Sequence, residues 1–171
     1  MTHRFLLDND GSNLFYNLTD DVERDIEEAA RECPAEVTTY LLCAGAGTFY
    51  YPTHVGEVVP NAPPLFTAHQ RGLDPLGLML RALRRAGKEV FLTYRMNDVH
   101  NPDAPDQWNT SRFKREHPDA IVDPRAVREK HADWMCYCLD YSREDVQDYI
   151  LATMRELVDL YGGEGLLDGI Q

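Results

Sequence analysis

The sequence predicts an α/β domain built on a parallel sheet. Short apolar runs alternate with amphipathic helical patterns along the 171 residues, in the order strand, helix, strand, helix, strand, helix, strand. This alternation is typical of parallel sheets whose crossover connections are right-handed. The chain is long enough for one domain with a real core, and it is short for a closed eight-stranded α/β barrel of roughly 250 residues.

The first strand and helix are predicted from an apolar run and from a capped amphipathic stripe. Residues 4–8 (RFLLD) are the run, and the polar loop DNDGSN follows it. Thr19 is the expected N-cap, because acidic residues fill the turn after it, where the helix dipole favours them. The stripe that starts with Val22 and Ile26 has the helical period, and Pro34 ends it.

The middle of the chain predicts two further strands with a helix between them. Residues 37–43 (VTTYLLC) are β-branched and apolar, as in a buried strand, and residues 44–73 form a long loop rich in glycine, proline and aromatic residues. Asp74 precedes a proline and is the expected cap of the next helix, which Gly87 ends. Residues 89–94 (EVFLTY) are the third strand.

The last part of the chain combines a very long loop, a helix and the start of a strand. Residues 95–141 exceed an ordinary connection from strand to helix, and loops of that length are usually functional or disordered. The aromatic residues of this loop favour the functional interpretation. Ser142 is the expected cap of the last helix, and residues 166–171 (LLDGIQ) begin a fourth strand. Both long loops follow strands, so they gather at the carboxyl edge of the sheet, where α/β proteins bind ligands.

The charge balance and the hydropathy limit the classes of partner. The formal net charge is −12, which repels phosphate backbones and argues against nucleic acid. No apolar stretch is long enough to cross a bilayer and no export signal is visible, so we expect a soluble cytoplasmic protein without a membrane partner. The four cysteines are expected to be reduced, and the scattered histidines lack the spacing of metal ligands, so no metal and no cofactor is predicted.

Side chains able to bind or process a ligand gather where the predicted strands end. An arginine can pair with a carboxylate and keep it ionised, while asparagine and histidine can bind hydroxyl groups. The candidates are Asp8 and Asp10 after the first strand, Arg95, Asn97, Asp98 and His100 after the third, and Asp140 and Tyr141 at the end of the long loop. The alternative is that Arg95 and Asp98 form a structural ion pair.

Aromatic residues in the predicted loops suit a sugar, whose C–H faces are apolar and whose rim is polar. Trp108 and Trp134 are the candidate stacking platforms, and Phe49, Tyr50 and Tyr51 lie in the earlier loop. For any single ring, the better-supported alternative is that it packs beneath its own loop and pins that loop in place.

The loop after the first strand also resembles the first motif of haloacid-dehalogenase-type phosphatases, an apolar strand followed by D-x-D-G-[ST]. This resemblance implies a magnesium-dependent reaction with Asp8 as the nucleophile and Asp10 as the general acid. Three features oppose it. Asn13 stands where that family has leucine or valine, no convincing lysine follows Thr93, and residues 95–100 are left without a role.

Four stretches taken together are similar to bacterial glycoside-hydrolase-like TIM-barrel proteins. In chain order they are YRMNDVHN, SRFKREHPD, CLDYSREDVQDYILATMREL and LLDGIQ. The resemblance implies a (β/α) barrel and a glycosidase that acts on a carbohydrate substrate. It makes Asp98 and Asp140 the candidate catalytic carboxylates, and the other site residues named above become candidate sugar contacts.

The chain departs from that family at its end. Such barrels continue their fourth strand into an acidic, aromatic and arginine-containing stretch, whereas this chain stops at Gln171. Glycoside hydrolysis usually needs two carboxylates roughly 5 to 10 Å apart, and in such barrels these lie on later strands. We therefore expect residues 1–171 to be the N-terminal half of a (β/α)8 barrel, truncated after the fourth strand begins and inactive alone.

A half barrel has two consequences. Its first and fourth strands would be open edges and its apolar interior would be exposed, which favours association into a homo-oligomer.

A third function also stays open, that of a carbohydrate-binding barrel which has lost its catalytic acids.

Overall fold

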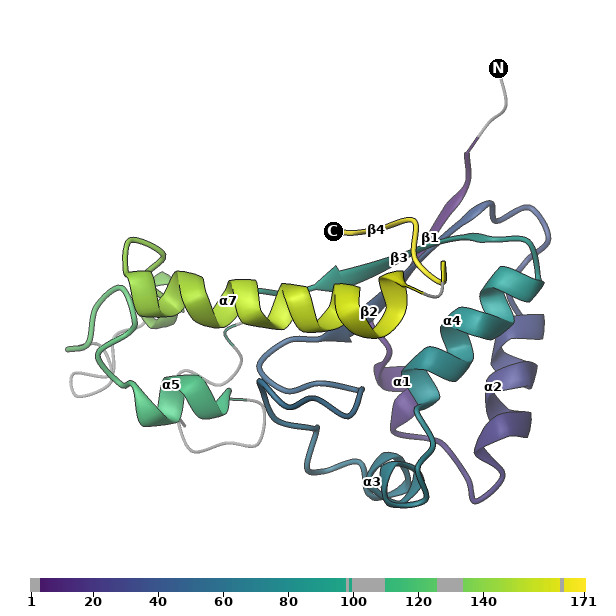
Figure 1. Ribbon diagram of the computed structural model, residues 1–171, viewed down its shortest axis with the longest axis horizontal. Helices are drawn as coiled ribbons and strands as arrows, with labels where there is room; N and C mark the ends of the chain where they lie inside the picture. The colour runs from purple at the N-terminus through teal and green to yellow at the C-terminus, as the bar shows by residue number, and fades with distance from the viewer. Residues whose placement is uncertain (1–3, 98, 100–109, 126–133, 164) are drawn as a thin grey trace.

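The computed structural model describes residues 4–97, 99, 110–125, 134–163 and 165–171 (Figure 1). Its centre is a four-stranded sheet in the order β1-β2-β3-β4, and all three pairings are parallel. The strands are β1 (Leu6–Asn9), β2 (Thr39–Gly45), β3 (Glu89–Tyr94) and β4 (Gly169–Ile170). The predicted parallel α/β sheet is therefore confirmed, with its four strands in chain order.

The helices occupy the connections between these strands. They are α1 (Ser12–Phe15), α2 (Val22–Arg31), α3 (Pro63–Gln70), α4 (Pro75–Arg85), α5 (Arg112–Glu116) and α7 (Glu144–Leu157). A 3-10 turn, η1 (Trp134–Tyr137), precedes α7, and a π-helical turn, η2 (Val158–Gly162), extends it. No helix in the described part of the chain is long and apolar enough to span a membrane.

The helices α2, α4 and α7 pack on one face of the sheet. On β2 and β3 that face is formed by Tyr40, Leu42, Val90 and Leu92, which share one core cluster with the buried residues of these helices. Phe91 points to the opposite face of the sheet, is only half-buried and lies outside that cluster. Along β2 and β3 the sheet therefore has one face covered by these helices and an opposite, inner face on which Leu41 and Cys43 of β2 are also buried.

This arrangement separates two of the sequence-based hypotheses. A doubly wound sheet reverses its strand order beside the first strand and carries helices on both faces. Here the order does not reverse, and β1 lies at an edge. The sheet is singly wound, as in one sector of a (β/α) barrel, which counts against the phosphatase hypothesis. The four strands do not close on themselves, so the described structure does not itself form a barrel.

Helix starts show which local signals were reliable. Asp74 caps α4 as predicted, since its carboxylate accepts the N–H of Gly77 at 3.1 Å. The predicted cap at Thr19 is wrong, because Asp21 caps α2 two residues later. Ser142 does not cap α7 either, because its hydroxyl donates to Asp140 instead.

The segment 44–73, predicted as a long loop, contains α3 and several buried rings. Phe49, Tyr50 and Tyr51 are all buried and belong to the core cluster. These rings therefore anchor the loop to the core and are not exposed for stacking on a sugar. Glu156 on α7 accepts the hydroxyl of Tyr51 at 2.8 Å. The tertiary packing of these rings explains why so long a connection is ordered.

Candidate functional site

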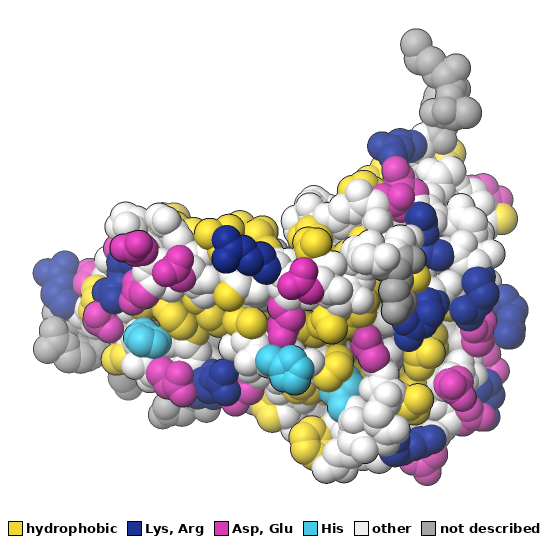
Figure 2. Space-filling view, viewed as in Figure 1, with side chains coloured by type: hydrophobic (Ala, Val, Ile, Leu, Met, Phe, Trp, Pro, Cys, Tyr) yellow, Lys and Arg dark blue, Asp and Glu magenta, His cyan; other side chains and the backbone are white. Residues whose placement is uncertain are grey.

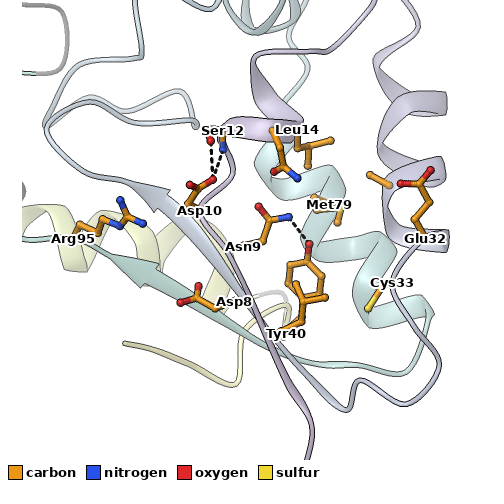
Figure 3. Close-up of a pocket in the computed structure, with 13 residues that line it drawn as sticks. Asp8, Asn9, Asp10, Ser12, Leu14, Glu32, Cys33, Tyr40, Met79 and Arg95 are labelled. Carbon is orange, nitrogen blue, oxygen red and sulfur yellow. Dashed lines mark hydrogen bonds between the residues drawn. The ribbon is translucent and has the colours of Figure 1, made fainter. Parts of the chain in front are cut away.

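A cavity of about 780 Å³ follows the open edge of β1 (Figure 3). Because successive side chains of a strand point to opposite faces, β1 lines this cavity from both faces of the sheet. Asp8 and Asp10 project on the inner face, where Arg95 lies across from them, and Asn9 projects toward the helices. Leu7 packs against the core cluster on the helix side. The cavity is therefore charged at the carboxyl edge of the sheet. Beside the helices its lining is mixed, with apolar Leu14 and Met79 next to polar Asn9 and Glu32.

Asp10 is held as an ionised acceptor at the end of β1. Its Oδ1 accepts the hydroxyl of Ser12 at 2.7 Å and the backbone N–H of Ser12 at 3.0 Å. These two bonds, with a smaller contribution from the charge of Arg95, lower the pKa of the Asp10 carboxyl below 3.8. A carboxyl group with a lowered pKa is a poor general acid near neutral pH, so Asp10 is suited to accept hydrogen bonds from a ligand.

The loop that presents Asp10 has a defined conformation with a sequence cause. Asn9 accepts the N–H of Gly11 at 2.8 Å and donates its amide to the hydroxyl of Tyr40, also at 2.8 Å. Gly11 has a φ of 81°, and a Cβ at this position would lie 2.9 Å from the ring of Tyr50. Only glycine fits this turn without strain, which gives the D-N-D-G-S stretch a structural role.

The segment after β3 is tied to the segment before α7. Arg95 begins it and donates its backbone N–H to Gly45 at 3.3 Å, at the end of β2. Asn97 accepts the N–H of Leu139 at 2.8 Å, and the hydroxyl of Tyr141 donates to the carbonyl of Met96 at 3.0 Å. The side chains of Asn97 and Tyr141 thus form hydrogen bonds that connect the segment after β3 with the segment before α7, both of which were predicted to carry site residues.

Asp140 repeats the geometry of Asp10. Its Oδ1 accepts the hydroxyl and the N–H of Ser142 at 2.7 and 3.0 Å, and these bonds lower the pKa of the carboxyl below 3.8. Asp140 does not line the cavity of Asp8 and Asp10. The sequence predicted Asp140 as one of two catalytic carboxylates. Because its pKa is lowered, Asp140 is suited to be the ionised carboxylate of such a pair and not the proton donor.

Several predicted site residues lie outside the described part of the chain. These are Asp98, His100 and Trp108. Trp134 begins the 3-10 turn η1, and its side chain is likewise outside the described set. The structure does not test the proposed roles of these four residues or the alternative ion pair of Arg95 with Asp98.

Two residues near the charged end of the cavity were not predicted from the sequence. Ser12 fixes Asp10, and the signal for it is the pattern D-x-S, which recurs at Asp140 and Ser142 with the same hydrogen bonds. Cys43 lies at the end of β2, near the charges of Asp10 and Arg95, and alternation along β2 could have placed it on the inner face. Burial raises the pKa of its thiol, which keeps it protonated.

Among the residues that the structure describes, no group of three or more histidine, cysteine, aspartate or glutamate side chains is placed to hold a metal ion. The described polar groups at the carboxyl edge of the cavity include the carboxylates of Asp8 and Asp10 and the guanidinium group of Arg95, which can form hydrogen bonds with a ligand.

Known proteins that are similar to this chain include two carbohydrate enzymes. No family model matches the chain. Over 93 residues it is 30% identical to the 1,4-alpha-glucan branching enzyme GlgB of Leifsonia xyli subsp. xyli, a match that covers 54% of this chain and 12% of that protein. The fold resembles the galactosidase domain of the alpha-galactosidase-sucrose kinase AgaSK, with a TM-score of 0.51 at 14% identity, over 93% of this chain and 20% of that one. The chain thus spans a small part of each protein that it matches, and the structural likeness concerns the fold alone.

Proposed function

We propose that this chain is a carbohydrate-active protein of the glycoside-hydrolase type, with its sugar site at the carboxyl edge of the sheet. The observation that carries the proposal is the joint placement of Asp8, Asp10 and Arg95 around one cavity at that edge. Carboxylates accept hydrogen bonds from sugar hydroxyl groups and a guanidinium group donates to them, so this set can hold a polyol. The similarity to two carbohydrate enzymes supports the same class.

Each remaining site residue has a proposed role. Asp98 is the acid–base or substrate-orienting carboxylate, with Arg95 as the group that keeps it ionised, and Asp140 is the second carboxylate. Asn97 and His100 contact hydroxyl groups. The aromatic and phenolic contacts come from Trp108, Trp134 and Tyr141. We further propose that the four strands are one half of a (β/α)8 barrel, since they are parallel, singly wound and in chain order.

We take the proposed substrate class from the names of the two matched proteins. One acts on an alpha-glucan and the other is an alpha-galactosidase, so we propose an α-linked glucoside or galactoside as the ligand. A titration of the 171-residue chain with maltose and melibiose, followed by NMR, should show saturable binding with a Kd near about 1 mM. The β-linked disaccharides cellobiose and lactose serve as controls and should bind more weakly.

The role of Asp10 is tested by Asp10→Asn. A hydrogen bond to a charged group contributes about 1.5 to 3 kcal/mol, so the affinity for the disaccharide should fall by about tenfold or more. Asp148→Asn removes a charge from an exposed position on α7 that does not line the cavity and should leave the affinity unchanged. If Asp10→Asn bound the disaccharide with the same affinity as the wild-type chain, Asp10 would not be a ligand contact.

A second function, sugar binding without turnover, is favoured by one observation. The pKa values of both Asp10 and Asp140 are lowered, so neither of these carboxyl groups is suited to donate a proton at neutral pH. Hydrolysis of a nitrophenyl α-glycoside, measured on a protein that contains both halves of the proposed barrel, distinguishes the two functions. Binding with release of nitrophenol supports the enzyme, whereas binding without release supports the binding protein. Magnesium-dependent release of phosphate from an aryl phosphate would instead support the phosphatase hypothesis.

A further inference from the structure

The ring of Tyr50 is held against the segment that follows β1. Its backbone N–H donates to the carbonyl of Ala44 at 3.0 Å, at the carboxyl end of β2. The ring centroids of Phe15 and Tyr50 are 4.7 Å apart, and the ring of Tyr16 meets that of Tyr50 edge-on at 6.2 Å. Tyr50 is only 8% exposed, so close packing fixes the direction of its side chain. The position of its hydroxyl group is therefore set by the core.

The hydroxyl end of this ring lies next to the candidate site. A Cβ on Gly11 would lie 2.9 Å from Cε2 of Tyr50, and Cε2 is bonded to the ring carbon that carries the hydroxyl group. Gly11 directly follows Asp10 in the chain. Electrostatic interactions couple the hydroxyl group to Asp10, Arg95 and Cys43. The group therefore lies within reach of their charges, at the carboxyl edge of the sheet.

The hydroxyl group of Tyr50 has no hydrogen-bond partner among the described residues. Other buried tyrosines do have one. The hydroxyl of Tyr51 donates to Glu156 at 2.8 Å, and that of Tyr161 donates to Asp74 at 2.9 Å. Buried tyrosine hydroxyl groups usually find a partner, so the unpaired group of Tyr50 requires an explanation.

This unpaired group is not sealed inside the core. In the part of the chain that the structure describes, the side-chain nitrogen and oxygen atoms that are both unbonded and shielded from solvent are the two ring nitrogens of His69. The Tyr50 oxygen is unbonded and is not one of them, so it reaches solvent although its ring is buried. It can therefore exchange water for a ligand without a change in its own position.

The exposed apolar surface of α7 does not offer an alternative platform for a sugar. Figure 2 shows hydrophobic side chains gathered over this helix. The exposed large hydrophobic residues that the structure describes on α7 and η2 are the aliphatic Leu151, Val158 and Leu160. The apolar face of a sugar stacks on aromatic rings, so these side chains are poor sugar contacts. Polar groups at the carboxyl edge are better suited to the task.

We infer that the hydroxyl group of Tyr50 contacts the sugar and donates a hydrogen bond to one of its hydroxyl groups. This inference rests on the proposed function and adds to it a contact from the loop after β2. The ring of Tyr50 stays in the core and does not stack on the ligand. Only its hydroxyl group takes part, beside the carboxylates of Asp8 and Asp10.

The ionisation states of the site explain why a phenol is useful there. Burial raises the pKa of Tyr50, so its hydroxyl group is neutral and can donate at neutral pH. The pKa of Asp10 is lowered, so this carboxylate can only accept. A sugar hydroxyl group both donates and accepts, and it can therefore connect the phenol of Tyr50 with a carboxylate.

Tyr50→Phe removes only the hydroxyl group and tests the inference in the 171-residue chain. Its affinity for maltose or melibiose, measured by NMR titration, should fall by about fivefold, because one hydrogen bond is lost. Its urea midpoint of unfolding should stay within about 0.2 M of the wild-type value, because the hydroxyl group has no partner in the chain. Tyr51→Phe is the matched control. It removes a hydroxyl group that Glu156 accepts, so it should lower the urea midpoint by about 0.5 M or more and leave the affinity unchanged.

Monodeoxy forms of the bound disaccharide identify the sugar hydroxyl group that Tyr50 contacts. One form should bind the wild-type chain more weakly, because protein groups then lose their partner. Its loss of affinity should be smaller for Tyr50→Phe, since the effects of two groups in contact are not additive. If each form lost the same affinity from both chains, Tyr50 would contact no sugar hydroxyl group and the inference would be overturned.

The remaining outcomes separate this inference from the proposed function. Unchanged binding by Tyr50→Phe, together with weaker binding by Asp10→Asn, would overturn the role of Tyr50 alone. A loss of stability in Tyr50→Phe as large as that in Tyr51→Phe would also overturn it, because the hydroxyl group would then have a structural role. That result needs no sugar. A wild-type chain that binds none of the disaccharides would overturn the proposed function and this inference with it.

Discussion

At the carboxyl end of β1, the state of Asp10 depends on a single neighbour. The hydroxyl of Ser12 is the largest cause of the lowered pKa of this carboxyl group. A carboxyl with a lowered pKa stabilises the folded chain above its unfolded pKa of about 3.9, and this contribution is lost as the pH falls through the folded value. The Ser12 hydroxyl therefore contributes at neutral pH and not in strong acid.

Ser12→Ala should raise the pKa of Asp10 toward 3.8, because one of its two donors is lost. A carboxyl-carbon NMR titration measures this shift. Ser142→Ala is a matched control, because it removes the equivalent hydroxyl from Asp140 and should raise only the pKa of that residue. If Ser142→Ala also moved the Asp10 titration, the two turns would be coupled rather than independent.

His69 gives a second prediction at the scale of a residue. Burial against the core lowers its pKa below 6.5, so the folded chain holds this imidazole neutral. Stability is then fully present above the unfolded pKa of about 6.5 and falls as the pH decreases through it toward the folded value. His69→Gln should therefore reduce the loss of stability between pH 7.5 and 5.5, measured by urea denaturation.

Individual residues of the site were predictable to different degrees. The shared edge of Asp8, Asp10 and Arg95 follows from topology, because carboxyl ends of neighbouring parallel strands meet there. The hydrogen bond between Asn97 and Leu139 joins positions that are 42 residues apart in the chain, so no local sequence pattern could predict it. The partners of a polar side chain depend on which distant backbone groups the fold leaves unpaired.

At the scale of elements, strong local signals located the strands and α4. Residues 89–94 were predicted as a strand, and β3 has the same bounds. The failures at Thr19 and Ser142 share one cause, since a serine or threonine hydroxyl near an aspartate can bond within its own turn. The helix α3 was missed because glycine, proline and aromatic residues are spread through the whole segment 44–73, and Pro63 begins a helix only in the packed structure.

The loop after β2 is attached to α7 by one carboxylate, which gives a prediction at this scale. Glu156 accepts the hydroxyls of Tyr51 and Thr53 at 2.8 and 2.6 Å and the N–H of His54 at 2.6 Å. Glu156→Ala leaves three donors without this acceptor, so the free energy of unfolding should fall by about 2 kcal/mol or more. Urea denaturation measures the change, and Glu36→Ala, at an exposed position between α2 and β2, should cost less than about 0.5 kcal/mol. An equal, small effect of both substitutions would show that buried rings alone hold the loop.

At the scale of the whole molecule, the four strands follow one another in chain order and share one helix-covered face. The helices α2, α4 and α7 join Tyr40, Leu42, Val90 and Leu92 in a single core cluster on that face. The sequence predicted the parallel order of the strands through its alternating pattern, because that pattern depends on periodicity along the chain. The exposure of Leu151 and Val158 could not be predicted in this way, because it appears only once α7 is packed.

The net charge makes the last prediction, which concerns how the stability of the folded chain depends on salt. The chain carries a formal charge of −12, so its surface charges repel one another in the compact state. Exposed ion pairs contribute only about 0 to 1 kcal/mol each, so general repulsion should dominate. Raising the salt concentration from about 0.1 to 1 M shortens the screening length from about 10 to 3 Å, and the free energy of unfolding should therefore rise. Urea denaturation at both sodium chloride concentrations measures this. A lower stability at high salt would mean that the surface ion pairs stabilise the fold by more than the net charge destabilises it.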